Sequence, residues 1–163
     1  SAINDLTKLF FISLMFIGGG AGSVAGGIKV GTFAVIVAAV LSSIRGRLQA
    51  EAFGREIPHF QVHRAITVAV LGSSLIFIIS LALTFTESAA EIAFLDLLFE
   101  TVSAFGTTGL SMGIVPLLTV WGKIMLIALM ILGRLGPLAL ALALAPNEEA
   151  RVYRFAQERI RIG

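Results

Sequence analysis

The chain has 163 residues, of which 57% are hydrophobic and only 13% are charged, and its mean hydropathy is +0.97. Soluble domains carry about 25% charged residues, so this composition argues against a soluble domain and for a membrane protein. The net charge of +2 gives no support for nucleic-acid binding, and a sequence without cysteine offers neither disulfides nor thiolate metal sites.

The first predicted element is a membrane-spanning helix at residues 1–44 that a glycine-rich segment interrupts. Residues 9–17 and 30–41 are almost entirely apolar, and between them lies GGGAGSVAGGIK at residues 18–29. Each glycine lowers helix stability by about 1 kcal/mol relative to alanine. Unwound backbone at membrane depth is tolerated only where protein buries it or where it lines a wet cavity. We therefore predict a non-helical intramembrane loop at residues 18–29.

Two other interpretations of the glycine segment carry less weight. Gly18, Gly22 and Gly26 have the four-residue spacing of close helix packing, which stays the alternative to a loop. A phosphate-binding loop is not supported, because Ile28 and Lys29 stand where that motif needs lysine and then serine or threonine.

The distribution of charge predicts which segments lie inside the cell. Residues 45–64 and the tail at 146–163 are rich in arginine, whereas residues 86–119 contain no lysine or arginine and four acids. Because basic loops stay cytoplasmic, we expect the 45–64 loop and the 146–163 tail to be cytoplasmic and the 86–119 connection to enter from outside. The arginines concerned are Arg45, Arg47, Arg55, Arg64, Arg151, Arg154, Arg159 and Arg161.

Residues 65–145 are predicted to form one complete helix–pore-loop–helix unit. Residues 65–85 carry no charge and match the roughly 20 residues that a spanning helix needs. Residues 92–105 are too short to span and contain two acids, which suits a re-entrant half-helix, and residues 120–145 are long enough to span. The predicted fold is an all-α integral membrane protein, in which a glycine-broken transmembrane helix precedes this unit.

The segment GTTGL at residues 106–110 directly follows the predicted half-helix. A half-helix that enters from outside points its partly negative C-terminal end into the membrane, which favours a cation there. Gly109 permits backbone conformations closed to other residues, and successive carbonyl groups can replace the hydration shell of an ion. An ordinary external loop is the alternative, but the order span, half-helix, Thr-Gly segment, span favours a pore.

Arg134 lies within the last predicted span, with no acid near it in the sequence. A charge at the centre of a spanning helix costs roughly 2.5–3.5 kcal/mol on insertion scales, so its side chain should face the bundle interior or water. There it could repel cations or donate hydrogen bonds to carbonyl groups of the glycine loop. A snorkelling or lipid-bound arginine is the alternative.

An internal repeat relates two of the predicted helices. KLFFISLMFIGGGAG at residues 8–22 aligns with KIMLIALMILGRLGP at residues 123–137, and the alignment pairs Lys8 with Lys123 and Gly18 with Gly133. Chance similarity between apolar helices is the alternative. If the repeat is real, each segment is the last helix of one unit, and the glycine loop lies at a depth in the bilayer similar to that of Arg134.

Three motifs together resemble the Trk/Ktr/HKT superfamily of potassium transporters, in particular its bacterial Ktr-type pore subunits. They are FIGGGAGSVAGGIK at 16–29, FETVSAFGTTGLSMG at 99–113 and GRLGP at 133–137. In that family one chain carries four helix–pore-loop–helix units around a single pore. The resemblance implies that this chain corresponds to the second helix of the third unit and to all of the fourth. The missing N-terminal repeats of the same protein are then expected to complete the four-sided filter.

The resemblance also implies roles for particular residues. It assigns the fourth selectivity-filter segment, which binds K⁺ through backbone carbonyl groups, to Thr107, Thr108, Gly109 and Leu110. It makes Arg134 the pore charge that opposes the gate. The gate loop then comprises Gly18, Gly19, Gly20, Gly22, Ser23, Gly26, Gly27 and Lys29.

The resulting hypothesis is a multi-pass potassium-translocating subunit of the bacterial plasma (inner) membrane, without a cofactor, with Na⁺ as a second candidate ion. The resemblance implies a homodimer and a cytosolic ring of nucleotide-binding regulatory subunits, contacted by the basic loop and tail. Nothing in the sequence resembles a nucleophile–base pair or a carboxylate dyad, so we do not expect an enzyme. Two alternatives stay open: a small tetrameric two-helix cation channel formed by residues 65–145, and a non-conducting membrane assembly subunit.

Overall fold

The computed structural model describes residues 4–20, 22–46, 49–52, 55–87 and 92–136. Within these residues the chain is mostly helical, with one small hairpin. The elements in chain order are α1 (Asp5–Phe16), α2 (Val30–Ile44), β1 (Ala50–Ala52), β2 (Arg55–Ile57), α3 (His59–Thr86), α4 (Phe94–Gly106), the 3-10 turn η2 (Val115–Leu117) and α5 (Val120–Leu135).

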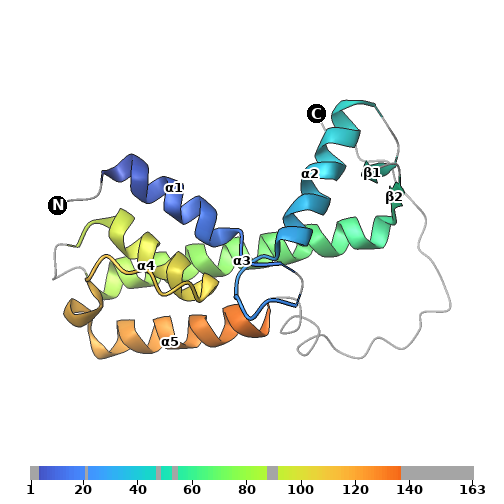
Figure 1. The fold of residues 1–163 in the computed structure, drawn as a ribbon. Helices are drawn as coiled ribbons and strands as arrows, with labels where there is room; N and C mark the ends of the chain where they lie inside the picture. Colours follow the sequence, from blue (N-terminus) through green and yellow to red (C-terminus); the bar gives the residue numbers. More distant parts are fainter. Residues whose placement is uncertain (1–3, 21, 47–48, 53–54, 88–91, 137–163) are drawn as a thin grey trace, which may run out of the picture.

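The long helix α3 runs the length of the molecule and organises the others (Figure 1). Helices α1, α4 and α5 gather along one part of α3, and α2 with the hairpin lies at its other end. The short helix α4 packs against α1, α3 and α5, so it occupies the centre of the first group. The chain between α1 and α2 crosses the middle of the molecule, close to the end of α4 (Figure 1).

The core of the protein is built around α4. Leu97 and every residue of α4 from Phe99 to Gly106 are buried. A helix that is buried on all sides needs apolar neighbours on all sides, and α1, α3 and α5 supply them. The buried cluster consists of Met15, Ile76, Leu83, Leu97, Phe99, Val102, Ala104, Phe105, Ile114, Leu118, Leu126 and Leu129.

Helix α3 is the one helix among the described residues that is both long and apolar enough to cross a membrane. Its 28 residues correspond to about 42 Å at 1.5 Å per residue. It begins at His59, six residues before the predicted start at Ala65. Pro58 precedes its first turn, and the Pro58 carbonyl accepts hydrogen bonds from the N–H groups of Gln61 and Val62, which starts the helix early. Residues 59–64, expected in a loop, are therefore helical.

The predicted 45–64 loop also contains the strands, which the all-α expectation did not include. Strands β1 and β2 pair antiparallel, with Ala50 opposite Ile57. The hydroxyl of Ser42, near the end of α2, accepts a hydrogen bond from the N–H of Glu51 at 3.0 Å. A two-stranded hairpin is marginal alone, so this anchorage to α2 stabilises it.

Helix α5 is described to its end at Leu135, where Gly136 has φ 83°. The predicted span at 120–145 continues beyond the described residues. So does the predicted tail at 146–163, with Arg151, Arg154, Arg159 and Arg161. Among the residues of the basic loop, Arg47 also lies outside them.

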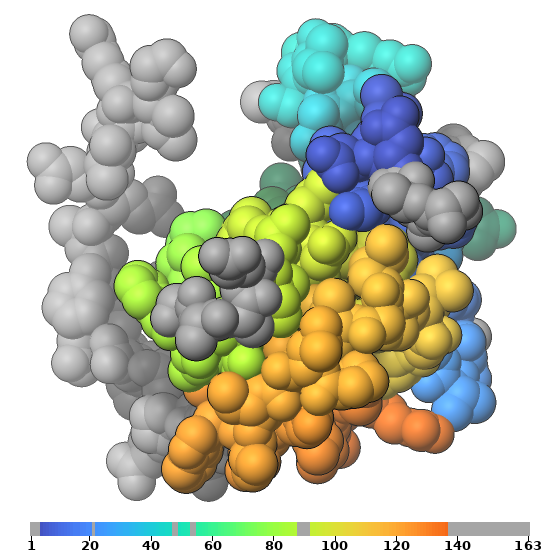
Figure 2. Space-filling model, turned by 90° about the vertical axis from the view of Figure 1, so that its left-hand side faces the viewer, coloured from blue at the N-terminus to red at the C-terminus, as the bar shows by residue number. Residues whose placement is uncertain are grey.

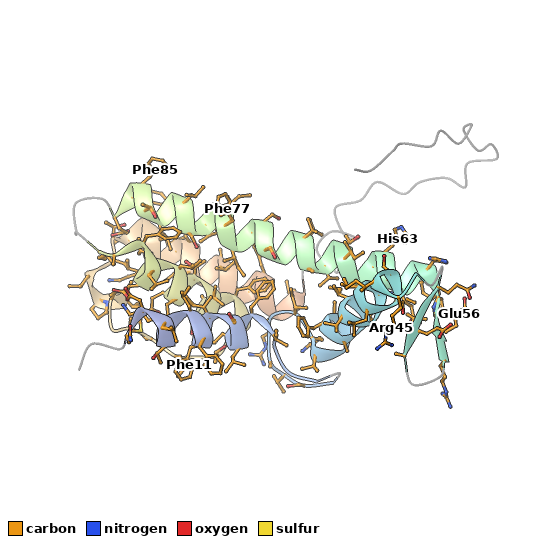
Figure 3. The ribbon with its side chains drawn as sticks, turned by 90° about the horizontal axis from the view of Figure 1, so that it is seen from above. Phe11, Arg45, Glu56, His63, Phe77 and Phe85 are labelled. Atoms are coloured by element: carbon orange, nitrogen blue, oxygen red, sulfur yellow. The ribbon has the colours of Figure 1, made fainter. Side chains whose placement is uncertain are left out.

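The outer faces of the helices carry large apolar side chains. Phe77 and Phe85 project from α3 away from the other helices (Figure 3), and they are 60% and 80% exposed. Leu6 on α1 and Ile127 on α5 are also exposed. Extensive exposed apolar surface marks contact with lipid or with other protein. The space-filling view looks onto the end of the molecule that lies on the left in Figure 1, where α1, α4 and α5 pack side by side (Figure 2).

Candidate functional site

The end of α4 has an unusual backbone conformation at Thr107. The N–H of Thr107 donates to the Ala104 carbonyl at 3.1 Å, and the N–H of Thr108 donates to the Ser103 carbonyl at 3.0 Å. These two bonds form a Schellman motif, which places Thr107 in the left-handed region at φ 49°. Among the described residues, Thr107 alone has positive φ without being glycine.

Thr107 is a costly residue for this position. A β-branched side chain in the left-handed region is a genuine outlier, and such backbone strain costs on the order of 1–3 kcal/mol. The hydroxyl of Thr107 accepts a hydrogen bond from the N–H of Gly26 at 2.9 Å. This bond joins the end of α4 to the glycine segment, 81 positions away in the sequence.

The predicted filter residues follow Thr107 along an accessible stretch of backbone. Thr107 is half-buried, and Thr108, Gly109 and Leu110 are exposed. Gly109 has φ 82° with open space around its α-carbon. The Leu110 carbonyl accepts a hydrogen bond from the hydroxyl of Ser103 on α4, so this carbonyl already has a protein donor.

A buried acid holds the segment after Leu110 against α4. Glu100 is 4% exposed, and its Oε1 accepts hydrogen bonds from the Ser111 hydroxyl at 2.6 Å and from the Met112 N–H at 2.7 Å. Because hydrogen bonds to a carboxylate are stronger than neutral ones, Glu100 fixes the path of the chain as it leaves the predicted filter.

The glycine segment is a folded loop between α1 and α2. Ile17 and Ile28 form a parallel bridge, in which the N–H of Gly18 donates to the Ile28 carbonyl at 2.7 Å. The N–H of Val30 donates to the Gly19 carbonyl at 3.2 Å, so the two ends of the loop lie side by side. Gly18 packs directly on the Gly26 carbonyl, where a Cβ would overlap it. The described residues between Ile17 and Lys29 therefore lie outside both helices.

Lys29 closes this loop. Its ammonium group donates hydrogen bonds to the Ser23 carbonyl at 2.9 Å and to the Ala25 carbonyl. Arg134 was expected to be able to make contacts of this kind, but it has no hydrogen bond or ion pair with any described residue. Instead, Arg134 is exposed and lines a hollow beside α5.

Thr107 lies between two hollows. One, of about 690 Å³, is lined by Glu100, Lys123 and Arg134 together with apolar residues of α5. The other, of about 500 Å³, is lined by Gly18 and Gly19 of the glycine loop and by residues of α1. Thr107 and Leu110 line both hollows. Arg134 and the glycine loop therefore approach the predicted filter from different sides.

Three glycines allow other backbone segments to reach the end of α4. A Cβ on Gly26 would lie 2.8 Å from the Phe105 carbonyl oxygen, and a Cβ on Gly106 would lie 2.8 Å from the Met15 carbonyl oxygen. A Cβ on Gly133 of α5 would overlap the Phe105 carbonyl. The peptide groups before Thr107 are therefore enclosed by the glycine loop, by α1 and by α5.

The model of the TrkH family, described as a cation transport protein, matches residues 1–152. The chain belongs to the TrkH cation transport family. Ktr system potassium uptake protein B of Bacillus subtilis is 42% identical over 151 residues, covering 93% of this chain and 33% of the relative. Ktr system potassium uptake protein D of the same organism is 37% identical over 163 residues, covering 100% of this chain and 36% of the relative.

A further relative is the potassium/sodium uptake protein NtpJ of Enterococcus hirae, which is 37% identical over 153 residues, covering 92% of this chain and 34% of the relative. The family resemblance read from the motifs is thus confirmed, and these relatives are transport proteins by name. This TrkH chain spans about a third of the length of the curated relatives that it matches.

Sequence reasoning missed the acids that organise this TrkH chain. Glu100 and Glu87 were considered only as negative charges. Glu87 is 3% exposed, and its carboxylate accepts hydrogen bonds from the N–H and the hydroxyl of Thr119 at 2.9 and 2.6 Å. Ser103, which donates to the Leu110 carbonyl, was not considered. A usable signal existed, because isolated acids in an otherwise apolar segment require partners when they are buried.

Proposed function

We propose that this chain forms part of a potassium pathway in a Ktr/Trk-type uptake system of the bacterial plasma membrane. The observation that carries the proposal is the accessible segment Thr107–Leu110, held at the C-terminal end of a short helix that is buried from Phe99 to Gly106. K⁺ would bind to the carbonyl groups of Thr107, Thr108 and Gly109. The negative end of the α4 dipole favours a cation there, and carbonyl oxygens can replace its hydration shell.

One chain of this length would supply one side of the ion site. The exposure of Thr108 and Gly109 is what a shared site requires, because each coordinating segment must face a common axis. We propose that the earlier units of a longer protein supply the other sides. The apolar outer surfaces of α1, α3 and α5 would then contact lipid and those units.

We propose that the glycine loop is the gate of this pathway. The loop touches the first residue of the proposed filter through the Gly26–Thr107 hydrogen bond, and it carries the positive charge of Lys29, which holds the Ser23 carbonyl. Arg134 would add a second positive charge from the hollow on the other side. Positive charge on a cation route opposes permeation, so displacement of these groups would favour flux.

The proposed cytoplasmic face includes the hairpin β1–β2 and the end of α2. Arg45 and Glu56 lie in this region, far from the end of α4 (Figure 3). We propose that this face meets a cytosolic ring of nucleotide-binding regulatory subunits, and that two copies of the complete transporter form a dimer. K⁺ is the proposed main substrate, with Na⁺ as a second ion.

The decisive experiment compares two glycines that have nearly the same positive φ. Gly109 and Gly113 have φ 82° and 80°, and a Cβ added at either position would meet no heavy atom within 4 Å. Alanine at either site is therefore strained to a similar degree, but only Gly109 lies in the proposed filter. In liposomes containing the full-length protein, Gly109→Ala should abolish selective K⁺ flux, and Gly113→Ala should retain most of it. Equal effects would contradict the proposal.

Arg134 is tested separately in the same full-length protein. Arg134→Ala should change K⁺ flux at a fixed amount of protein, and Arg134→Lys, which keeps the charge, should retain most of the native behaviour. Unchanged flux and ion selectivity in the alanine variant would remove Arg134 from the mechanism. If the unaltered full-length protein conducts no ions, the non-conducting assembly subunit is favoured instead. A stable four-fold oligomer of this chain alone, found by native mass spectrometry, would favour the small tetrameric channel.

A further inference from the structure

We infer that the Thr107 side chain is a positioning residue that couples the glycine loop to the first carbonyl of the filter. The inference rests on the proposed function, since it assumes that the loop moves and that the carbonyl groups bind the ion. It adds a specific side-chain link between the gate and the filter. A gate loop and a filter could each function without such a link.

The first step of the argument is the choice of residue. The left-handed position of a Schellman motif is usually glycine, because glycine has no Cβ to clash. This chain has threonine there at φ 49°, although it uses glycine at neighbouring positions such as Gly106 and Gly109. Two Schellman hydrogen bonds support this conformation from the helix side. Because the side chain itself disfavours it, a contact made by that side chain adds to the support.

The second step is the identity of that contact. The Thr107 hydroxyl accepts a hydrogen bond from the N–H of Gly26 at 2.9 Å. Among the described residues, no other hydrogen bond joins the loop at 17–29 to the segment at 107–110. Gly26 fits tightly against its partner, because a Cβ there would lie 3.0 Å from the Thr107 Oγ1 atom. The contact therefore depends on the loop being docked.

The third step is the consequence for the filter. When the loop moves away, Thr107 loses its donor and nothing on the loop side holds its left-handed backbone. A change of Thr107 backbone angles turns the Thr107 carbonyl, which is the first of the proposed K⁺ ligands. Thermodynamic linkage makes the coupling reciprocal, so a filter that holds Thr107 in place also favours the docked loop.

The experiment uses the full-length protein, freed of any native cysteine and carrying Ala25→Cys as a reporter. Ala25 is half-buried, adjoins Gly26, and lines the hollow beside Thr107 and Thr108. Its rate of reaction with a water-soluble thiol reagent measures undocking of the loop. Thr107→Val removes the hydroxyl and keeps the shape of the side chain, whereas Thr107→Ser keeps the hydroxyl.

Thr107→Val should raise the Ala25→Cys reaction rate by about 2- to 10-fold, the range expected for the loss of one hydrogen bond. Thr107→Ser should stay near the native rate. Flux measurements on the same samples should show a lower K⁺-to-Na⁺ preference for Thr107→Val and its rescue by Thr107→Ser. The neighbouring pair Thr108→Val and Thr108→Ser is the control: changes there can alter ion preference, but they should leave the reporter rate unchanged.

Equal reporter rates in Thr107→Val and Thr107→Ser would overturn the coupling. If Thr107→Val does not fold, Thr107→Gly decides the question, because glycine relieves the backbone strain and also lacks the hydroxyl. The coupling predicts a raised reporter rate for Thr107→Gly as well, and a native rate would reject it. Failure of the proposed function gives a different result, namely no selective K⁺ flux in the protein with native Thr107.

Discussion

Lys8 and Asp96 form an ion pair between α1 and the first turn of α4, with 2.6 Å between the lysine Nζ and the aspartate Oδ1. Their side chains are only 12% and 22% exposed. This pair fixes the beginning of α4 against α1, while the hydrogen bond from Gly26 to Thr107 joins the glycine loop to its end.

We expect Asp96→Asn to lower the free energy of unfolding of the full-length protein by about 1.5–3 kcal/mol, because a partly buried hydrogen bond to a charged group is weakened. Thermal unfolding in detergent measures the effect. A double-mutant cycle with Lys8→Met is the control, since the two changes should be clearly non-additive. Additive effects would show that the pair contributes little.

Thr119 begins α5 and should be sensitive to loss of its hydroxyl. The hydroxyl accepts from the Gly122 N–H at 3.2 Å and donates to buried Glu87 at 2.6 Å. We expect Thr119→Val to destabilise the full-length protein by about 0.5–2 kcal/mol, the usual effect of removing a helix cap. Thr119→Ser, which keeps the hydroxyl, should unfold near the native temperature. Equal melting temperatures for the two variants would contradict this role.

Gly133 should tolerate no side chain, because its α-carbon lies against the Phe105 carbonyl. We expect Gly133→Ala to push α5 away from α4 and to reduce K⁺ uptake strongly in cells that depend on the full-length protein. Gly31→Ala is the matched control: it is also helical and has open space around it. There alanine should be neutral or stabilising by up to about 1 kcal/mol. Similar loss of uptake in both variants would refute the packing argument.

Lys29 should hold the glycine loop in its folded form. We expect Lys29→Met to raise the maximal rate of K⁺ uptake by the full-length protein, because the Ser23 and Ala25 carbonyl groups lose their donor and the proposed gate loop loses a positive charge. Tracer uptake of Rb⁺ measures the rate. Lys29→Arg preserves the charge and the hydrogen-bond donors, so its uptake rate should be closer to that of the native protein. A lower rate in Lys29→Met, at equal protein level, would argue against a closed loop.

The helical framework could be predicted from the sequence because it depends on local composition and periodicity. The half-helix predicted at 92–105 is α4 at Phe94–Gly106, and the interruption predicted at 18–29 lies between α1 and α2. Runs of apolar residues and clusters of glycine are local signals that survive without knowledge of packing. The family was also readable from the motifs.

The start of α3 and the hairpin could not be predicted, because the local sequence preferences there are weak and tertiary contacts determine which structure forms. The pairing of β1 with β2 is stabilised by Ser42 on α2, which no local pattern reveals. At the site, the Thr107–Gly26 bond spans 81 positions. The left-handed backbone of Thr107 contradicts its residue-type preference, so a prediction based on preferences places glycine there instead.

The enclosure of the Phe105–Thr107 backbone has a consequence for inhibitors. Glycine contacts from the loop and from α5 leave no room for even a methyl group at Gly26 or Gly133, so a small-molecule blocker cannot wedge between those segments and the end of α4. Its way to Thr107 is through one of the two hollows that Thr107 and Leu110 line. In the larger hollow it would meet mainly apolar side chains and the positive charges of Lys123 and Arg134, so an apolar compound with an anionic group suits that approach.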